Sequence, residues 1–193
     1  MNTPYAAKQY LTELKEALDN FNLEKFEKIV NLILNAYKDE KQIFTMGNGG
    51  SGSTASHFAC DLNKGCCNNL EKKIKMICLN DNTPTLLAFA NDVSYDVVFV
   101  EQLKNFFNPG DLVIGISGSG NSENVIKAIH HTKQNNGQTI GFSGFSGGKL
   151  AKMVDVPFVA KVDDIQKVED IHMILVHMIM QAIYSALQPR GQK

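Results

Sequence analysis

The sequence lacks the features that mark nucleic-acid-binding, membrane and secreted proteins. Its 193 residues carry 19 Lys and Arg against 20 Asp and Glu, mixed along the chain, so no basic face or acidic tail stands out. The longest purely apolar runs are far shorter than the roughly 20 residues that span a bilayer. The N-terminal stretch has no apolar signal core and reads as an amphipathic helix. We therefore expect a cytoplasmic protein with no nucleic-acid or membrane partner.

Cysteine and linker segments are also scarce. The four cysteines fit no zinc-finger or redox spacing, and a chain of this length needs no disulfide, so we expect reduced thiols. No low-complexity segment divides the sequence, and 44% hydrophobic residues can build a sizeable core. We expect one domain over residues 1–193, with a helical segment at about 4–38 and an α/β core at about 40–188.

Short apolar runs alternate with segments of helical periodicity from residue 42 to residue 188, which predicts a parallel sheet covered by helices on both faces. The expected strands are 42–46, 73–79, 112–117, 139–144 and 156–162. The expected helices are 4–20, 23–38, 51–62, 83–92, 95–107, 122–137 and 166–188. Ligands of such folds bind at the carboxyl ends of the strands, where the two most unusual loops of this sequence lie.

The serine loop, residues 117–122, reads Ser-Gly-Ser-Gly-Asn-Ser between a predicted strand and a predicted helix. Three hydroxyls and several backbone N–H groups meet there at the positive end of a helix dipole, which favours an anion. Ser122 fits the N-cap position, but a capped turn needs one serine rather than three. The loop has no lysine, so it is no P-loop, and it suits a sugar monophosphate better than a nucleoside triphosphate with magnesium.

The glycine loop, residues 47–52, fits the dinucleotide pattern G-x-G-x-x-G. A dinucleotide fold would use an acid near the end of the second strand, and Asp81 could serve. That interpretation does not explain the serine loop. It also does not explain His57 and Asp61, which lie in the helix that follows the glycine loop. We therefore favour a smaller ligand.

Two predicted helices carry polar residues on one side. His57 and Asp61 are four residues apart and share a helical face. Glu169 and His177 are eight residues apart on the last helix, where His177 interrupts an apolar stretch. Such a set could bind Zn²⁺ or another divalent cation, or it could serve as an acid/base set without metal. For His172 we expect a position on the helix surface or behind the site.

Six motifs occur in the order in which one known family has them. The chain resembles the sugar isomerase (SIS) family, and within it the phosphoheptose isomerases. The motifs are "GNGGS" (47–51), "SHFACDL" (56–62), "ND" (91–92), "SGSGNSENVIKAI" (117–129), "GGKLA" (147–151) and "VEDIHMILVH" (168–177). The resemblance implies a single SIS domain, a three-layer α/β sandwich related to flavodoxin and Rossmann folds, with extra N-terminal helices. It also implies a homotetramer with active sites between subunits.

The resemblance assigns roles by position. The serine loop would hold the phosphate, the glycine loop would line the sugar, and Asn91 and Asp92 would reach the substrate from a neighbouring subunit. The substrate-binding residues would be Asn48, Gly49, Gly50, Ser51, Asn91, Asp92, Ser117, Gly118, Ser119 and Ser122. The ligands of one zinc ion per subunit would be His57, Asp61, Glu169 and His177. For the chemical step, our own hypothesis is that Asp61 and His177 exchange the protons, with Glu169 as a ligand or substitute acid/base.

The implied reaction is the aldose–ketose isomerisation of sedoheptulose 7-phosphate to D-glycero-D-manno-heptose 7-phosphate through an enediol. One alternative is an SIS isomerase acting on another sugar phosphate. Another is a non-catalytic SIS protein that binds phosphosugars or the bacterial replication initiator. The initiator-binding relative lacks a histidine at the position of His177, which favours an enzyme here. A sugar-phosphate-sensing regulator would need a DNA-binding domain, for which the N-terminal helices are too few and too weakly charged.

Three residues depart from the family pattern. The family usually has Glu at position 61, Gln at 169 and Thr at 118, where this chain has Asp61, Glu169 and Gly118. Asp61 is one methylene shorter, so its carboxylate is set back by roughly 1.5 Å. Glu169 adds a negative charge, which strengthens cation binding. These changes either preserve the chemistry or indicate a different sugar.

Overall fold

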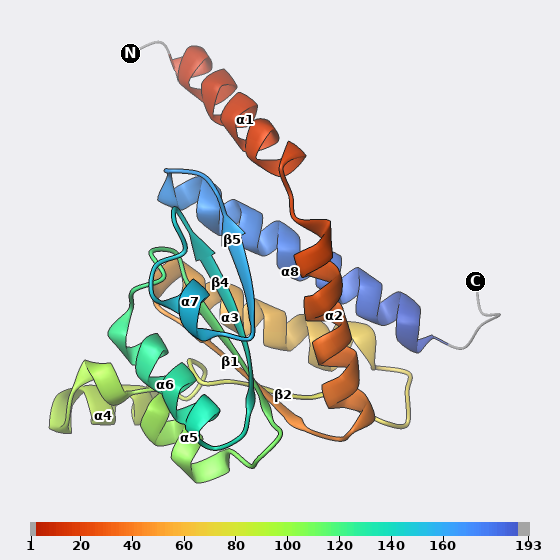
Figure 1. The fold of residues 1–193 in the computed structure, drawn as a ribbon, viewed down its shortest axis with the longest axis vertical. Coiled ribbons are helices and arrows are strands. Elements are labelled where there is room, and N and C mark those ends of the chain that lie inside the picture. The colour runs from red at the N-terminus through yellow and green to blue at the C-terminus, as the bar shows by residue number, and fades with distance from the viewer. Residues whose placement is uncertain (1–2, 189–193) are drawn as a thin grey trace.

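A computed structural model describes residues 3–188, and a five-stranded parallel sheet lies at its centre (Figure 1). The strands follow the spatial order β2-β1-β3-β4-β5. Their bounds are β1 Gln42–Gly47, β2 Lys75–Cys78, β3 Leu112–Ser117, β4 Gln138–Gly144 and β5 Val156–Ala160. The expected parallel sheet is confirmed, and each strand pairs with its neighbour in parallel register.

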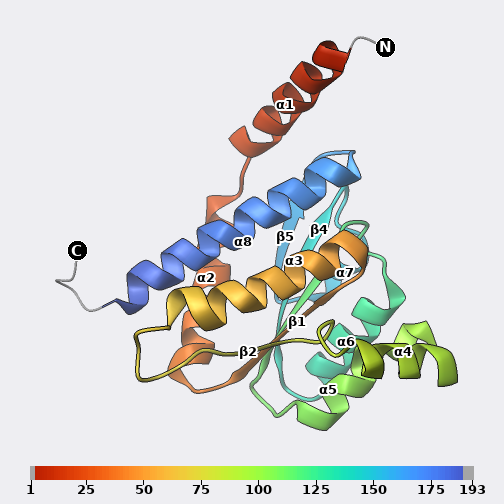
Figure 2. The same ribbon diagram turned by 180° about the vertical axis from the view of Figure 1, so that it is seen from behind.

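Helices cover both faces of this sheet and make the expected three layers (Figures 1 and 2). One face packs against α2 (Leu23–Lys38), α3 (Gly49–Cys60) and α8 (Ile165–Leu187). The other face packs against α5 (Val100–Phe106), α6 (Glu123–Gln134) and α7 (Leu150–Met153). Side chains alternate between the two cores along each strand, as period-two geometry requires. Ile43 belongs to the first core and Phe44 to the second.

The strand order reverses between β1 and β3, and the two loops of the candidate site leave the sheet at this position. The glycine loop leaves β1 toward α3 on one face, whereas the serine loop leaves β3 toward α6 on the other. The two strands are neighbours, with Gly47 of β1 paired with Ile116 of β3. Ligands of open α/β sheets bind at such a switch point.

The helix expected over residues 95–107 is broken in two. A single 3₁₀ turn, η2 (Tyr95–Val97), precedes α5 (Val100–Phe106). The Ser94 hydroxyl starts the turn by accepting a hydrogen bond at 3.1 Å from the backbone N–H two residues on. Phe99 is fully buried between the two pieces, so packing of this ring overrides the helical periodicity.

Three smaller differences concern helix ends and a short helix. The helix expected to end at 62 becomes a π-helical segment, η1 (Asp61–Cys66). The helix α7 has only four residues and was not expected. The α6 helix ends at Gln134 rather than at residue 137, and Asn136, with φ 60°, takes a left-handed conformation just beyond its end.

Two helices stand out from the body of the molecule. The α1 helix (Thr3–Asp19) projects beyond the sheet, and α4 (Thr83–Asp92) lies at its side (Figure 1). Neither helix has a buried residue. Polar contacts attach α1 to the start of α8, where the Tyr10 hydroxyl donates to Asp170 at 2.6 Å and the buried Lys167 ammonium pairs with Glu13 at 3.0 Å. The hydrogen bond to Asp170 raises the pKa of Tyr10 to about 12.

Within the part of the chain described, α8 has the length and composition that could cross a membrane, with a mean hydropathy of 1.3. One such helix is weak evidence, because a core helix of the same length passes the same test. Here one side of α8 packs on the sheet through fully buried residues such as Val168, Leu175 and Ile179. We therefore interpret α8 as a core helix.

Candidate active site

The serine loop closes a tight turn at the carboxyl end of β3. Gly120 has φ 66°, and its N–H donates to the Ser117 carbonyl at 2.9 Å. The Ser117 and Ser122 hydroxyl oxygens lie 2.9 Å apart and share a hydrogen bond. Ser122 is the N-cap residue of α6, as expected, yet its side chain makes no capping bond. The Ser122 hydroxyl is therefore not used to cap α6, and it lies at the positive end of this helix, where an anion is favoured.

The remaining residues of the serine loop explain its shape. Ser119 is exposed, and its hydroxyl oxygen accepts a hydrogen bond from the Asn121 N–H at 3.2 Å. A Cβ atom added to Gly118 would overlap the Cδ1 atom of Ile165, at the start of α8. A threonine at 118 would therefore require the Ile165 side chain to move.

The glycine loop turns the chain from β1 into α3. The Asn80 side chain holds Gly47, accepting from its N–H at 3.1 Å and donating to its carbonyl at 2.7 Å. A Cβ atom at Gly47 would lie 2.6 Å from the Ser51 backbone, so a larger residue does not fit. Gly49 has φ 53°, a conformation that favours glycine. Ser51 is buried in the first turn of α3, with 5% of its surface exposed.

Asn48 makes contacts that the sequence did not reveal. Its amide oxygen accepts from the Tyr95 hydroxyl at 2.7 Å and from the Asn124 amide at 3.0 Å. Its own amide N–H group donates to Asn124 at 2.9 Å. Neither Tyr95 nor Asn124 was predicted, because only the fold brings η2 and α6 to the glycine loop. Asn124 lies inside the family motif at 117–129, and Tyr95 lies close to the motif at 91–92. These motifs were the only sequence signal that could have indicated the two residues.

The α3 and α8 helices run side by side in the same direction, and the four predicted metal ligands lie along their seam (Figure 2). Near the sheet, the Glu169 carboxylate lies against Gly50, where an added Cβ would stand 2.6 Å from the carboxylate carbon. Further along, His57 faces His177, with ring centroids 5.1 Å apart. The helix spacing of 1.5 Å per residue places Glu169 and His177 roughly 12 Å apart along α8.

His57, Asp61 and His177 form a compact group of metal-ligating atoms, which we call the His–Asp–His group. The two Nε2 atoms are 3.1 Å apart, and Asp61 Oδ2 lies 3.3 Å from His57 Nε2 and 4.0 Å from His177 Nε2. About half of each imidazole and 21% of the Asp61 side chain are exposed, so an ion and a ligand could reach them. Tetrahedral ligands about 2.0–2.1 Å from a zinc ion are about 3.3 Å from one another, so this donor set fits a divalent metal.

Glu169 lies outside the His–Asp–His group. Its position roughly 12 Å along α8 from His177 accounts for this, because two helical turns separate the two side chains. The carboxylate instead lies over the first turn of α3, where the helix dipole favours negative charge. The structure thus has a carboxylate at the mouth of the glycine loop and a group of candidate metal ligands further along the seam.

Asn91 and Asp92 do not join these residues in the subunit. They lie exposed at the end of α4, where the Asn91 amide donates to the Asp92 carboxylate at 2.7 Å. The two residues could contribute to a site only where α4 meets another molecule or moves.

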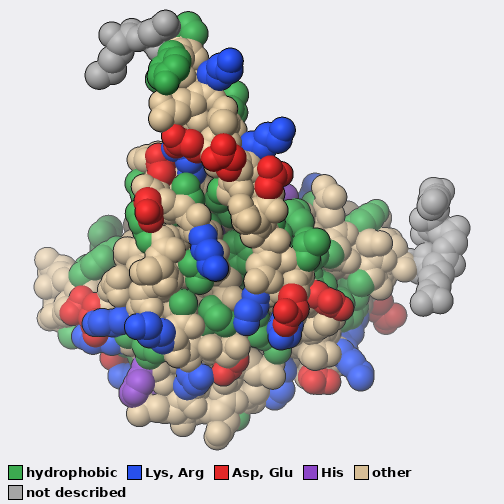
Figure 3. All heavy atoms as spheres, turned by 45° about the horizontal axis from the view of Figure 1, so that its top comes forward, with side chains coloured by type: hydrophobic (Ala, Val, Ile, Leu, Met, Phe, Trp, Pro, Cys, Tyr) green, Lys and Arg blue, Asp and Glu red, His purple; other side chains and the backbone are tan. Residues whose placement is uncertain are grey.

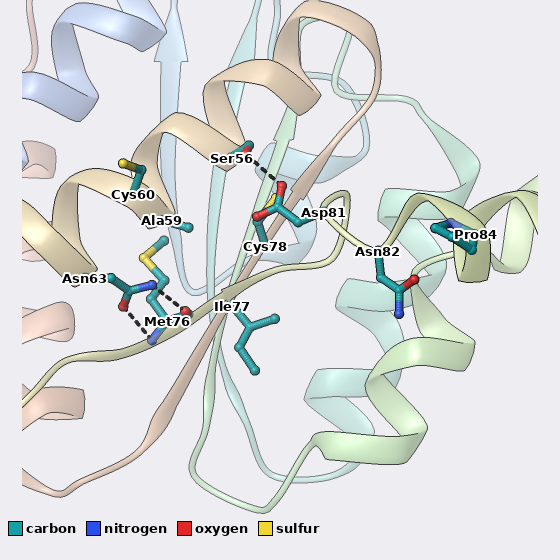
Figure 4. Close-up of a pocket in the computed structure, with 10 residues that line it drawn as sticks. All are labelled: Ser56, Ala59, Cys60, Asn63, Met76, Ile77, Cys78, Asp81, Asn82 and Pro84. Carbon is teal, nitrogen blue, oxygen red and sulfur yellow. Dashed lines mark hydrogen bonds between the residues drawn. The ribbon is translucent and has the colours of Figure 1, made fainter.

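A hollow of about 640 Å³ lies on another side of α3, beside the edge strand β2 (Figure 4). Its polar groups are largely paired with one another. Ser56 donates to Asp81 at 2.7 Å, and the Asn63 amide donates to and accepts from the Met76 backbone. Asp81, the acid that a dinucleotide site would use, thus contacts Ser56 on α3.

His172 is fully buried, which excludes the helix surface, one of the two positions that we expected for it. Its Nε2 atom lies 3.1 Å from the Ser143 carbonyl oxygen, and its ring packs against Phe142. Burial lowers the pKa of His172 to about 4, so the residue is neutral at physiological pH. The four cysteines are free, as expected, and burial raises the pKa of Cys66 and of Cys78 to about 12.

The SIS domain profile matches residues 8–144 of this chain, which is more than half of its length. The chain belongs to the SIS domain family. It is 40% identical over 177 residues to the probable phosphoheptose isomerase of Thermoplasma acidophilum, an alignment that covers 92% of this chain and 97% of the other. It is 34% identical to the phosphoheptose isomerase of Helicobacter pylori strain P12, over 88% of each chain.

The fold agrees with solved SIS structures. The phosphoheptose isomerase of Neisseria gonorrhoeae superposes with a TM-score of 0.87 at 27% identity, covering 96% of this chain and all of the other. The match to the SIS profile includes the glycine loop, His57, Asp61 and the serine loop, whereas Glu169 and His177 lie beyond it on α8. The expected SIS sandwich of the phosphoheptose isomerase type is therefore confirmed.

Proposed function

We propose that this protein is a phosphoheptose isomerase, converting sedoheptulose 7-phosphate to D-glycero-D-manno-heptose 7-phosphate through an enediol. The observation that carries the proposal is that the serine loop and the start of the α3–α8 seam lie at one switch point of the sheet. An anion site at the serine loop and a proton-transfer and metal group on the α3–α8 seam are what a phosphosugar isomerase requires. The relatives named phosphoheptose isomerase, at 34–40% identity, favour a heptose phosphate.

The serine loop anchors the phosphate in this proposal. Ser117, Ser119 and Ser122 donate hydroxyl hydrogen bonds, and Gly118 brings backbone close to the ligand. Asn48, Gly49, Gly50 and Ser51 line the sugar. Binding energy from the phosphate then orients the distant reacting carbons, so that part of the barrier is removed by positioning.

Zinc is the proposed cofactor, one ion per subunit, held by His57, Asp61 and His177, with Glu169 as a further ligand if its side chain turns toward them. A bound zinc ion would supply Lewis-acid polarisation of the substrate carbonyl. The support is the donor set itself, because two imidazole nitrogens and one carboxylate oxygen suit Zn²⁺.

Protons move on residues of this chain. One group removes a proton from C1 of the ketose while O2 takes up a proton, which gives the enediol. A proton then returns to C2 while O1 gives up its own proton, which gives the aldose. We assign these steps to Asp61 and His177, which keep Oδ1 and Nδ1 outside the His–Asp–His group. Glu169 is the substitute acid/base, since its carboxylate lies at the mouth of the glycine loop.

We also propose a cytoplasmic homotetramer with sites at subunit interfaces. Support comes from α1 and α4, which have no buried residue and expose large apolar side chains (Figure 3). Leu11 of α1 is 65% exposed and Leu87 of α4 is 59% exposed. Packing α4 against another subunit would bring Asn91 and Asp92 to a neighbouring site.

The proposal is tested by incubating the purified protein with the ketose phosphates of five-, six- and seven-carbon sugars and following aldose formation by NMR. We expect turnover of sedoheptulose 7-phosphate to exceed that of the others. Preference for a shorter sugar would replace the substrate but keep an SIS isomerase. Binding of every sugar phosphate with turnover of none would favour a non-catalytic role.

A further inference from the structure

Three polar side chains from three separate elements meet between the glycine loop and α6. Asn48 lies in the glycine loop, Tyr95 in η2 and Asn124 in the first turn of α6. The Tyr95 hydroxyl lies 2.7 Å from Asn48 Oδ1. The two amides pair with each other, with 3.0 Å from Asn124 Nδ2 to Asn48 Oδ1 and 2.9 Å from Asn48 Nδ2 to Asn124 Oδ1. The Val125 backbone nitrogen lies 2.9 Å from Asn124 Oδ1. Asn124 is buried, with 2% of its surface exposed.

The hydrogen bonds fix the orientation of the side-chain amides of Asn48 and Asn124. The Val125 N–H belongs to the first turn of α6 and has no intrahelical acceptor, so Asn124 must turn its carbonyl oxygen toward it. The same oxygen then accepts from the Asn48 amide, which forces Asn48 to turn its own oxygen toward the Asn124 amide and the Tyr95 hydroxyl. Tyr95 is therefore the donor in its contact with Asn48.

This arrangement limits what Asn48 can offer a ligand. A primary amide has two acceptor positions and two N–H donors. Tyr95 and Asn124 occupy both acceptor positions of Asn48, and Asn124 takes one of its donors. One N–H remains, so Asn48 can bind a sugar only by donating to one of its oxygens.

We propose that Tyr95 and Asn124 are positioning residues for the isomerisation, and this rests on the function proposed above. They hold Asn48 as a donor toward the sugar and tie the glycine loop to the helix that follows the serine loop. The spacing between the phosphate anchor and the reacting end of the sugar is thereby fixed. Tyr95 acts through Asn48 and does not touch the reacting carbons.

Tyr95→Phe is the sharpest variant, because the ring is 50% exposed and only a hydroxyl is removed. Loss of one hydrogen bond of about 1 kcal/mol predicts a turnover number about fivefold lower. Inhibition by inorganic phosphate should change less than twofold, because the serine-loop hydroxyls are untouched. Tyr184→Phe is the matched control, on an exposed tyrosine roughly 28 Å along α8 from Ile165, and should match the parent.

The Asn48→Ala background tests whether Tyr95 acts through Asn48. We expect Tyr95→Phe to change kcat less than twofold once Asn48 has lost its amide, because coupled residues are not additive. An equal loss in both backgrounds would overturn the proposal, as would full activity of Tyr95→Phe in the parent. A parallel fall in phosphate affinity would also contradict it, by indicating a distorted serine loop.

A measurement independent of turnover separates this inference from the proposed function. The side-chain NH₂ signals of Asn48 can be assigned in a ¹⁵N–¹H spectrum by their disappearance in Asn48→Ala. Tyr95→Phe should shift these signals whether or not the protein isomerises any sugar. Unmoved signals would refute the tie between Tyr95 and Asn48 even if the parent is an active isomerase. Shifted signals with an inactive parent would retain the tie and reject the proposed reaction.

Discussion

Replacing Gly50 by alanine should separate stability from activity. Gly50 lies in the first turn of α3, where alanine is favoured over glycine by about 0.5–1 kcal/mol. A Cβ atom there would stand 2.6 Å from the carboxylate carbon of Glu169, whereas ordinary contacts begin at 3.4 Å. The carboxylate must therefore retreat by about 0.8 Å, and a displaced rotamer costs about 0.5–1.5 kcal/mol. The two stability effects nearly cancel.

Activity should respond far more strongly than stability. A displacement of about 1 Å in a catalytic group can cost a hundredfold in rate, so we expect kcat of Gly50→Ala to fall about a hundredfold. The midpoint of thermal unfolding should stay within about 4 °C of the parent, because 1 kcal/mol shifts a chain of this size by about 2–4 °C. Calorimetry and the NMR turnover assay measure the two quantities. Ser53→Ala, an exposed change one turn further along α3, is the control.

A double variant tests the cause. In a Glu169→Asp background the side chain is one methylene shorter and its carboxylate lies further from Gly50. Gly50→Ala should therefore lower kcat by a much smaller factor than in the parent. The reasoning fails if Gly50→Ala keeps full turnover, or if it costs the same factor in both backgrounds.

Three further outcomes are expected. Ser122→Ala should raise KM for the sugar phosphate about tenfold, from loss of a hydrogen bond to a charged group; an unchanged KM would remove Ser122 from the phosphate site. The variant should lower the free energy of unfolding by only about 1 kcal/mol, because Ser122 makes no capping bond and loses a single hydrogen bond, to Ser117. His177→Asn should lower kcat by at least two orders of magnitude and leave the binding of inorganic phosphate intact. Near-normal turnover would contradict the assignment of His177 to proton transfer. His172 has a pKa of about 4 in the folded protein against an ordinary 6.5, so the unfolded chain takes up a proton on this residue first as the pH falls. The free energy of unfolding should therefore fall by about 3 kcal/mol between pH 6.5 and pH 4. In urea unfolding, His172→Gln should show a smaller fall over this range, and parallel pH profiles for the variant and the parent would contradict this.

The fold could be predicted because each strand is a short apolar run that ends at a glycine or polar loop. Local rules failed where packing decides. The buried Phe99 breaks a helix that periodicity continues, and the helix expected to reach residue 137 ends at Gln134, before the left-handed Asn136. The π-helical turn that begins at Asp61 depends on how α3 meets α8, where Gly65 lies against Met180.

The site shows the same division. His57 and Asp61 lie four residues apart on one helix, so their proximity follows from helical geometry alone. The pairing of His57 with His177 needs the parallel packing of α3 and α8, which no local pattern specifies. Glu169 shares a side of α8 with His177 but lies two turns away, so a common helical face did not bring it into the His–Asp–His group. Tyr95 and Asn124 meet Asn48 only through the fold.

The measurement that tests the central claim most directly is NMR of the chelated protein with sedoheptulose 7-phosphate in D₂O, before and after Zn²⁺ is restored. The account predicts that aldose signals appear only after zinc is added and that the new aldose carries deuterium at C2, as an enediol intermediate requires. Conversion by the metal-free protein would contradict the proposed role of zinc. Absence of conversion with zinc bound would contradict the proposed reaction.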